Sequence, residues 1–362
     1  MKSTNAITQL KVRAVRLPMP VPHRTAGGVI SESPLVLLDL YTSAGVVGRS
    51  YVFTYTPVAL LPTAMLLREL APSLVGVNAV PHDVERVLTQ RFRLLGPQGL
   101  TGIAVAAVDM AIWDVVARTA QVSLVTLLGA SSRPLRAYGG VGYDGVRGSA
   151  DAAERWARAG MSGVKAKIGY PSVQEDLDVI RAMRSAVGND IEIMVDYNQC
   201  LNAVEARTRL RALDDEGLCW IEEPTTAHDF AGLSACARET RTPLQAGENW
   251  WGPGDFVTAI DAGASDHLMP DVMKVGGVTG WMRVAALAQA KGLPVSNHLF
   301  PEVSVHLMTA SPTAFRFEYA DWWNAVIQEP LAVENGFVEA NESRVGSGIE
   351  WNEELIATHI VE

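Results

Sequence analysis

Residues 163–224 read GVKAKIG (163–169), a stretch of helical periodicity (172–187), EIMVDYN (192–198), a second helical stretch (202–216) and CWIEEP (219–224). Short apolar runs with little alternation are typical of strands buried on both faces. Strands that alternate with helical stretches predict βαβ units and a parallel sheet. This stretch therefore indicates the α/β class.

The same alternation extends in both directions from this stretch. The eight strand candidates are LRAYGGV (135–141), GVKAKIG (163–169), EIMVDYN (192–198), CWIEEP (219–224), PLQAGEN (243–249), HLMPDVM (267–273), PVSNHLF (294–300) and AFRFEYA (314–320). Helical patterns at 149–160 and 278–290 lie between further runs. Eight strand–helix units within one segment predict a (β/α)8-type barrel.

The N-terminal third of the chain has a different pattern of predicted strands and helices. Residues 7–53 predict strands, interrupted by PHRTAGGVISES (22–33), whose Gly, Ser and Thr content predicts a long mobile loop. Helical periodicity follows, which together with these strands predicts an α+β domain. The predicted helices span 57–75, 82–95 and 99–128. The predicted domains are 1–131 (α+β), 132–322 (barrel) and 323–362, a C-terminal segment that returns to the first domain.

Composition excludes several classes of protein. The 362 residues are 48% hydrophobic and 19% charged, which excludes a disordered chain. The formal net charge of −10 argues against binding to nucleic acid or anionic membranes. Three cysteines without CxxC spacing predict a reducing, cytoplasmic setting. We find no pattern of a signal peptide and no unbroken apolar run of membrane-spanning length.

Ionisable residues lie near the carboxyl ends of seven consecutive runs. They are Lys167, Asp196, Glu222, Glu248, Asp271, His298 and Glu318. Their separations are about the length of one βα unit. Because catalytic groups gather at the C-terminal rim of such a barrel, the series predicts an active site there.

Three of these residues form a candidate metal site. Asp196, Glu222 and Glu248 come from consecutive strands, and no His or Cys ligand accompanies them. A hard, all-oxygen set suits Mg²⁺. Converging carboxylates repel one another unless they are protonated or bound to a cation, so the trio favours a divalent metal.

The remaining members of the series are candidate acids and bases. Lys165 and Lys167 share one face of a strand, so we expect each to lower the pKa of the other, as a neighbouring Mg²⁺ also does, and Lys167 to serve as a general base. Asp271 and His298 end neighbouring strands, which predicts a carboxylate that orients the imidazole. If its setting keeps it protonated, Glu318 would donate a hydrogen bond to a substrate carboxylate.

These residues and their motifs resemble the mandelate racemase subgroup of the enolase superfamily over essentially the whole chain. The motifs are VKAKIGY (164–170), IMVDYNQ (193–199), WIEEP (220–224), GENW (247–250), MPDVMKVGGVTGW (269–281) and SNHLF (296–300). The resemblance implies a capping domain over a (β/α)8-type barrel, Mg²⁺ at the carboxylate trio and proton abstraction next to a substrate carboxylate. It also implies two acid/base catalysts, Lys167 and His298, and an octameric assembly.

The resemblance implies roles for further residues. Lys165 would contact the substrate carboxylate, Asn198 the 2-hydroxyl, and Glu318 would stabilise the enediolate. A lid formed by residues 22–30, with His23 and Thr25, would cover the site together with Phe53 and Tyr55. The closest resemblance is to the racemase for which the subgroup is named, but the pocket departs from it. The departures are His23, Gly27, Gly140 and Ala320, which predict a roomier, more polar pocket.

Three functions remain open from the sequence. The first is a Mg²⁺-dependent racemase of a 2-hydroxy acid, and the second is a sugar-acid dehydratase that shares the enolisation step. The third is a noncatalytic barrel that kept only the fold. Two glycine patterns suggest other sites: GVGYDG (140–145) resembles a dinucleotide-binding loop, and Gly276-Gly277 resembles a phosphate site at a helix start. We interpret both as barrel loops.

Overall fold

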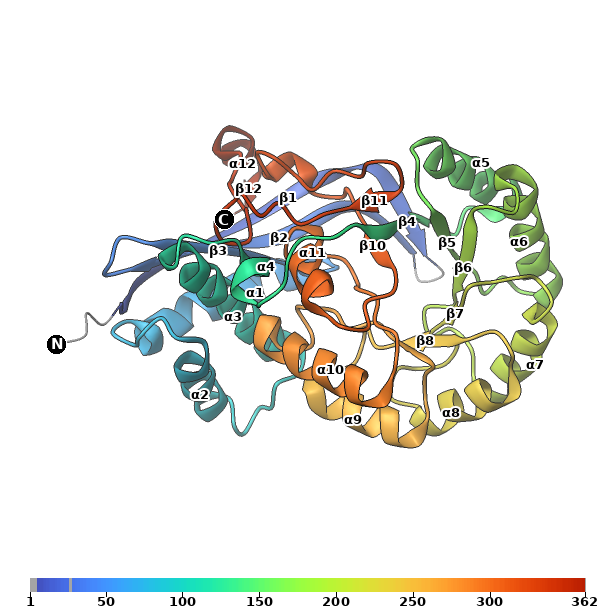
Figure 1. Cartoon of the computed structure of the whole chain (residues 1–362), viewed down its shortest axis with the longest axis horizontal. Helices are drawn as coiled ribbons and strands as arrows, with labels where there is room; N and C mark the ends of the chain where they lie inside the picture. The colour runs from blue at the N-terminus through green and yellow to red at the C-terminus, as the bar shows by residue number, and fades with distance from the viewer. Residues whose placement is uncertain (1–4, 26–27, 362) are drawn as a thin grey trace.

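The computed structural model describes residues 5–25 and 28–361, and it contains an α+β cap beside a barrel (Figure 1). The cap sheet is antiparallel, with strand order β12-β1-β2-β3. Its strands are β1 (Ile7–Thr25), β2 (Gly28–Thr42), β3 (Val47–Phe53) and β12 (Ile360–Val361). The chain therefore begins and ends in the same sheet.

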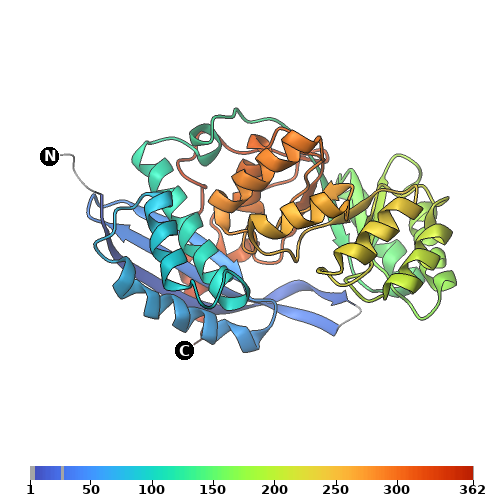
Figure 2. The ribbon, with the colours of Figure 1, turned by 90° about the horizontal axis from the view of Figure 1, so that it is seen from below.

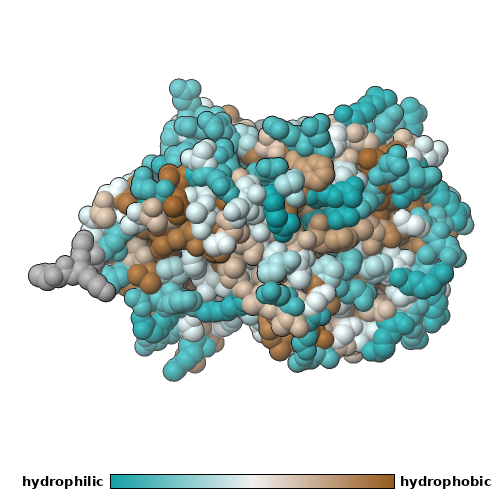
Figure 3. Space-filling view, viewed as in Figure 1, coloured by the Kyte–Doolittle hydropathy of each residue, from teal (hydrophilic) through white to brown (hydrophobic). Residues whose placement is uncertain are grey.

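Helices cover one face of this sheet (Figure 2). Helices α1 (Pro57–Leu74) and α3 (Gly99–Thr119) contact the sheet, whereas α2 (Pro81–Arg91) and the short α4 (Leu124–Leu127) pack against α3. The helix predicted over 99–128 is thus two helices, because a turn with Gln121 at a positive φ of 57° separates them. In the view of Figure 3, hydrophilic side chains surround the outer barrel helices, whereas a hydrophobic patch lies over the cap.

Helix α3 is apolar and long enough to cross a membrane by length and composition. The sequence had suggested that no segment reaches this threshold. However, 72% of its most apolar window is buried inside the protein, and α3 packs against β3 and α10 (Gly277–Lys291). The helix therefore serves as the core helix that joins the cap to the barrel.

The barrel sheet is parallel along the order β10-β4-β5-β6-β7-β8-β9. Its strands are β4 (Leu135–Val141), β5 (Gly163–Lys167), β6 (Glu192–Asp196), β7 (Ile221–Glu222), β8 (Leu244–Ala246), β9 (His267–Leu268) and β10 (Phe317–Tyr319). The fold class predicted from the sequence is confirmed. Most regular strands end earlier than predicted, because the chain turns where the polar residues begin.

The run at 294–300 forms no regular strand, although it closes the barrel. Val295 bridges Leu268 on one side and Ala314 on the other, both in parallel. Pro294 has no N–H to donate, and Leu299 and Phe300 have positive φ angles of 50° and 52°. Only a few residues between these points can pair as a strand, so the seventh position of the barrel is held by isolated bridges.

The barrel helices lie outside the sheet (Figure 1). They are α5 (Gly145–Arg158), α6 (Val173–Val187), α7 (Ala203–Leu213), α8 (Phe230–Glu239), α9 (Gly252–Ala262), α10 (Gly277–Lys291) and α11 (Pro301–Ala310). The sequence patterns predicted α5, α6, α7 and α10 and left α8, α9 and α11 unassigned.

The C-terminal segment returns to the cap, as predicted. It contains the 3-10 helix η1 (Asn324–Val326), β11 (Phe337–Val338) and α12 (Glu353–His359) before β12. Strand β11 pairs with β4 of the barrel, whereas β12 pairs with β1 of the cap. The indole of Trp351 donates to Asp39 of the cap at 2.7 Å. The domain boundaries themselves stay a prediction.

The prediction of a long loop at 22–33 is wrong. Strands β1 and β2 continue through it as a hairpin in which His23 pairs with Ile30 and Thr25 with Gly28. Residues 26 and 27, and with them Gly27 of the predicted lid, lie outside the described residues. The hairpin extends from the cap toward the barrel (Figure 2), where the Tyr143 N–H donates to the Arg24 carbonyl at 2.8 Å. The cap thus supplies a rim to the barrel mouth.

Candidate active site

The carboxylates of Asp196, Glu222 and Glu248 converge at the carboxyl ends of consecutive strands. Asp196 ends β6, Glu222 ends β7 and Glu248 lies two residues beyond β8. One oxygen from each lies within 4.8 Å of the others, and all three side chains are buried. The structure therefore brings together the three residues that the sequence spacing selected.

Each carboxylate of this trio faces a basic group. The Lys165 ammonium is 2.6 Å from Glu222, Lys167 pairs with Asp196, and His298 Nε2 is 3.4 Å from Glu248 Oε2. Burial raises the pKa of Glu222 well above its ordinary value, although Lys165 opposes this shift. Burial acts in the same direction on Glu248, but His298 and the lysines hold its pKa below the usual range.

The trio fits a hard divalent cation. All of its donors are carboxylate oxygens, and Glu248 Oε2 is buried without a hydrogen-bond donor. Glu222 Oε2 accepts from the Trp220 indole at 3.0 Å and from the Gln245 amide at 3.0 Å. These two neutral donors fix the Glu222 carboxylate, so its second oxygen faces the other two ligands.

The two lysines of β5 lie among carboxylates, whose effect on the pKa of Lys167 opposes that of Lys165. Burial lowers the pKa of Lys167 and so does Lys165, as predicted, but Asp196, Glu248 and Glu222 outweigh them and raise it. The pKa of Lys165 is raised well above its ordinary value for the same reason, because burial is outweighed by Glu222 and Glu318. Both lysines are therefore cationic while they pair with these carboxylates.

His298 is held by a carboxylate behind it and by an aromatic ring beside it. Its Nδ1 atom lies 2.7 Å from Asp271 Oδ2. The Tyr55 hydroxyl donates to the same oxygen at 3.1 Å, and its ring lies parallel to the imidazole at 6.5 Å. Burial lowers the pKa of His298, but Glu248 and Asp271 outweigh burial and raise it. Asp271 thus fixes the ring with Nε2 toward the trio.

Glu318 lies where predicted, as a carboxylate paired with Lys165. One of its oxygens is 2.9 Å from Lys165, and the other accepts from the Leu299 N–H at 2.9 Å. Burial favours the neutral acid, but Lys165 and His298 outweigh it and lower the pKa. While it pairs with Lys165, Glu318 is a carboxylate, so hydrogen-bond donation from it requires that this pair is broken.

The predicted substrate-binding residues make different contacts, and not all of them face the site. Asn198 donates from its side chain to Asp196 at 3.0 Å, and its own side-chain oxygen has no partner. His23 is buried, with its ring 4.9 Å from the Trp322 ring, and burial lowers its pKa to about 3. Phe53 packs on Tyr55 and Trp322 rather than on the cavity, and Thr25 donates to the Gly28 carbonyl within the hairpin.

A small cavity of about 40 Å³ is lined by the two lysines, His298, Glu318 and His23, but not by Asn198, Thr25, Phe53 or Tyr55. Its lining residues are His23, Gly140, Trp156, Lys165, Lys167, His298, Leu299, Glu318, Tyr319, Ala320 and Trp322. This volume holds about one water molecule. The cavity is thus closed over by the cap hairpin and by the aromatic side chains around it.

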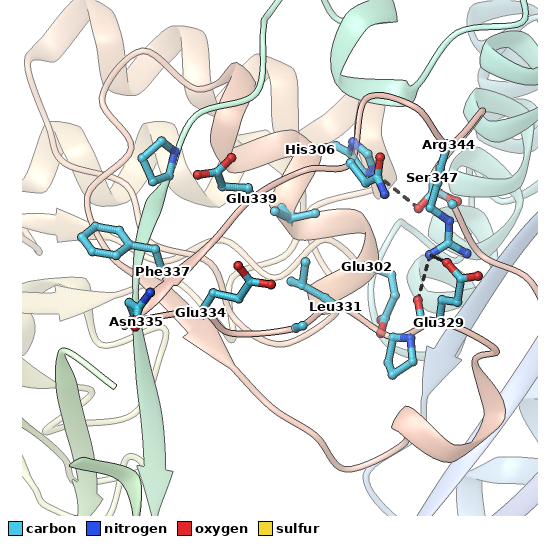
Figure 4. Close-up of a pocket in the computed structure, with 16 residues that line it drawn as sticks. Glu302, His306, Glu329, Leu331, Glu334, Asn335, Phe337, Glu339, Arg344 and Ser347 are labelled. Carbon is cyan, nitrogen blue, oxygen red and sulfur yellow. Dashed lines mark hydrogen bonds and ion pairs between the residues drawn. The ribbon is translucent and has the colours of Figure 1, made fainter. Parts of the chain in front are cut away.

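A much larger cavity of about 620 Å³ lies elsewhere, between α11 and the C-terminal segment. Figure 4 shows the carboxylates of Glu334 and Glu339 in it, with Glu329 and Arg344 paired at one end. Four glutamates and a single arginine line it. An acidic substrate is repelled by such a lining, so the small cavity at the trio is the better candidate for the active site despite its size.

A second polar network lies behind the trio and was not predicted. Asn249 donates to both oxygens of Glu223, at 3.0 and 2.8 Å, and accepts from Lys274 at 2.6 Å. The Lys274 ammonium also lies 4.7 Å from the centre of the Tyr55 ring. Each of the first three residues lies within a motif that supplies a site residue, namely WIEEP, GENW and MPDVMK. Their position next to site residues in the sequence was the signal that could have predicted this network.

Comparison with known families gives two matches that together span most of the chain. Residues 148–355 match the family described as enolase C-terminal domain-like. Residues 7–129 match the N-terminal domain of mandelate racemase and muconate lactonizing enzymes.

Individual relatives have different activities. A 3,6-anhydro-alpha-L-galactonate cycloisomerase of Streptomyces coelicolor is 30% identical over 95% of this chain and 96% of its own length. An L-talarate/galactarate dehydratase of Salmonella typhimurium is 30% identical over 74% of this chain and 69% of its own length. Among solved structures, a Bradyrhizobium enolase complexed with magnesium and mandelic acid is 43% identical over 100% of both chains, with a TM-score of 0.94.

Proposed function

Because the chain belongs to the enolase superfamily, in its mandelate racemase and muconate lactonizing enzyme branch, we propose that it racemises a 2-hydroxy acid by a two-base mechanism. The observation that carries the proposal is that Lys167 and His298 line one cavity beside the carboxylate trio. A carbon acid bound there would have a base on each side. Two bases facing one carbon are what inversion at that carbon requires.

Asp196, Glu222 and Glu248 would hold Mg²⁺, as their all-oxygen donor set favours. When bound, the cation supplies positive charge that stabilises a substrate carboxylate and the enediolate formed from it. Its charge would also replace the basic groups that now face the trio. Lys167 and His298 would then be released from ion pairing with metal ligands and would have lower pKa values, as bases require.

Side chains of the protein would transfer the α-proton of the substrate and stabilise the negative charge of the enediolate. Lys167 would remove the α-proton from one enantiomer, and His298, oriented by Asp271, from the other. Lys165 lies between Glu222 and Glu318 and would contact the substrate carboxylate. Glu318 would take up a proton when substrate displaces Lys165 and would then donate a hydrogen bond to the enediolate. Asn198 would contact the 2-hydroxyl group through its unpartnered side-chain oxygen.

The rim of the cavity would select the substrate. The cavity is narrow, so binding would move the hairpin or the aromatic side chains of the rim. His23 is neutral at pH 7, so it would offer a hydrogen bond rather than a charge to the distal part of the substrate. Trp156 and Trp322 supply flat apolar walls, and Gly140 and Ala320 leave space beside them. These features favour a mandelate-like acid with a polar group on its ring.

A second candidate function is dehydration of a sugar acid. It would use the same enolisation, after which one base returns as an acid to expel the 3-hydroxyl group. Two observations favour it: the polar His23 in the cavity, and relatives such as the L-talarate/galactarate dehydratase. Arg24 gives it little support, because its side chain is 61% exposed and lies 3.5 Å from Asp144.

One screen tests both candidates. Enantiopure 2-hydroxy acids and sugar acids are incubated with the protein and Mg²⁺ in D₂O, and deuterium incorporation and 2-keto product are followed together. Deuterium incorporation without keto product supports the racemase, whereas keto product supports the dehydratase. If no acid in the panel incorporates deuterium and none forms a keto product, both proposals fail. On the family resemblance alone we also propose a symmetric octamer, which a molar-mass measurement in solution tests.

A further inference from the structure

The N-terminus of α10 is capped by a carboxylate from the cap domain. Asp109 of α3 accepts from the Thr279 N–H at 3.0 Å and from the Thr279 hydroxyl at 2.5 Å. The residue before the helix, Gly276, has no side chain to do this. A negative charge at this end of a helix is stabilising. Burial raises the pKa of Asp109 to about 7, so above that pH the chain itself supplies the anion that the Gly276-Gly277 pattern suggests.

The contact between Asp109 and Thr279 is closely fitted. A Cβ atom at Gly277 would lie 2.3 Å from Asp109 Oδ2, and Gly277 has a positive φ of 75°, so only glycine is accommodated there. Trp113, one turn further along α3, donates from its indole to the Thr279 hydroxyl at 2.9 Å. The hydroxyl must therefore donate to Asp109 and accept from Trp113. Asp109 is only 6% exposed, so water competes little for these bonds.

A short turn connects this contact to the catalytic dyad. The Asp271 carbonyl accepts from the N–H groups of Lys274 at 3.0 Å and Val275 at 2.8 Å. The Asp271 carboxylate accepts from the Met273 N–H at 2.7 Å. The Gly277 N–H, at the start of α10, donates to the Val272 carbonyl at 2.8 Å. Residues 271–277 thus form one continuous hydrogen-bonded unit whose first carboxylate holds His298.

We propose that Asp109 is a positioning residue for His298, acting through Thr279 and the 271–277 turn. The cap holds this turn at both ends, with Tyr55 on the Asp271 carboxylate and Asp109 at the helix start. Lys167 lies on β5, on the other side of the trio, and its ion pair with Asp196 does not involve the turn. Loss of Asp109 therefore disturbs one base and spares the other. This inference rests on the two-base function proposed above.

The test is α-proton exchange from each enantiomer, measured separately at pH 8 with Mg²⁺. In Asp109→Asn we expect exchange from the enantiomer served by His298 to fall at least about tenfold, since small misplacements of a catalytic group have large effects. Exchange from the enantiomer served by Lys167 should change less than about twofold on the same reasoning. An equal fall for both enantiomers, or no change for either, would overturn the inference.

Asp114→Asn is the matched control. Asp114 is a buried aspartate on the same helix, but it binds the Arg49 N–H at 2.8 Å, the Arg118 side chain at 2.6 Å and the Ser347 N–H at 2.7 Å. It should leave the ratio of the two exchange rates unchanged, even if the cap is destabilised. A change of this ratio equal to that in Asp109→Asn would contradict a specific role of Asp109.

A second pair of variants keeps the test decisive if Asp109→Asn folds poorly. Thr279→Val removes the hydroxyl and keeps the backbone N–H, so it should lower the His298-side exchange by a smaller factor. Thr279→Ser restores the hydroxyl and should restore the rate. Failure of serine to rescue would count against the proposed hydrogen-bond path.

Amide hydrogen exchange gives a readout that does not depend on catalysis. In Asp109→Asn, protection should fall in peptides covering 271–279 and stay unchanged in α6 (Val173–Val187). Unchanged protection at 271–279 would overturn the inference. If the wild-type protein exchanges no acid at all, the proposed function fails, whereas this measurement still decides whether Asp109 fixes the turn.

Discussion

His298 Nε2 lies 3.4 Å from Glu248 Oε2, so a proposed base is paired with a proposed metal ligand. Lys167 is paired in the same way with Asp196. Together with the Lys165–Glu222 pair, these contacts set a basic group against each of the three buried carboxylates. This arrangement implies that cation binding and base activity are coupled, because a cation on the trio displaces the bases from it.

Mg²⁺ should raise the thermal stability of the protein through the trio. A ligand at one hundred times its Kd stabilises a folded protein by about 2.7 kcal/mol. Glu248→Gln should remove most of the Mg²⁺-dependent rise in melting temperature. Glu334→Gln, which alters an exposed carboxylate in the larger cavity, should keep it. A Mg²⁺ response that survives in Glu248→Gln would show that the cation binds elsewhere, and activity unaffected by a chelator would show that it is not needed.

His298→Asn should separate the two bases. Exchange of the α-proton from one enantiomer should disappear, because asparagine cannot accept the proton, while Lys167 continues to exchange the other. Racemisation should be lost in both directions, since each direction needs both groups. Proton NMR in D₂O with each pure enantiomer measures this. Exchange from both enantiomers at wild-type rates would refute the two-base mechanism.

Substitutions of Glu318 should distinguish hydrogen-bond donation from charge. Glu318→Ala should lower kcat by about 10²–10³, the usual effect of removing one donor from a developing oxyanion. Glu318→Gln keeps a donor without charge and should lose less activity. The comparison is made by steady-state kinetics with a common substrate. Equal losses in both variants would mean that the Glu318 carboxylate, rather than its donated hydrogen bond, is what the reaction uses.

His306 should contribute to the loss of stability in acid. Burial lowers its pKa from 6.5 to about 4, and its Nδ1 atom accepts from the Val125 N–H at 3.2 Å. Below pH 6.5 the His306 imidazole takes up a proton in the unfolded chain, whereas in the folded chain it stays neutral until the pH approaches 4. The stabilisation of the folded state is therefore present above pH 6.5 and is lost as the pH falls toward 4. The loss is at most about 3 kcal/mol.

The variant His306→Asn keeps an acceptor that cannot be protonated. It should therefore flatten the fall in unfolding free energy between pH 6.5 and 4, measured by chemical denaturation. The exposed His82 provides the control, and His82→Asn should leave the profile unchanged. A wild-type slope in His306→Asn would assign the acid sensitivity to other groups.

Gly140→Ser should reduce the size of the substrates that the cavity accepts, without disturbing the fold. A Cβ atom at Gly140 meets nothing within 4 Å, and the residue lines the small cavity. The added side chain should therefore lower kcat/KM for bulky 2-hydroxy acids more than for small ones. A series of acids of increasing size, assayed with both proteins, measures this. A uniform effect across the series would mean that Gly140 does not border the distal part of the substrate.

The sequence predicted the parts of the site that follow from the repeat of the fold. Asp196, Glu222 and Glu248 could be predicted because one βα unit separates each from the next, and the strand ends meet at one rim. The hairpin at 22–33 was missed because its composition is that of a loop, whereas pairing such as His23 with Ile30 is set across two strands. The run at 294–300 was assigned as a strand although Pro294 and two positive φ angles prevent one.

Protonation states were the least predictable feature. Proximity of Lys165 to Lys167 suggested a lowered pKa, but the net effect depends on the carboxylates packed around both lysines. Glu318 likewise depends on Lys165, whose reach to it only the folded structure reveals. Asp109 could not be found from spacing at all, because it acts across the boundary between cap and barrel, 170 residues away from Thr279.

The most direct test of the central claim is solvent deuterium incorporation into enantiopure 2-hydroxy acids, mandelate first, with Mg²⁺ in D₂O. The two-base account predicts deuterium at the α-carbon and formation of the opposite enantiomer from either starting enantiomer, with no 2-keto acid formed. A protein that forms a 2-keto acid from a sugar acid and incorporates no deuterium into any 2-hydroxy acid would contradict it.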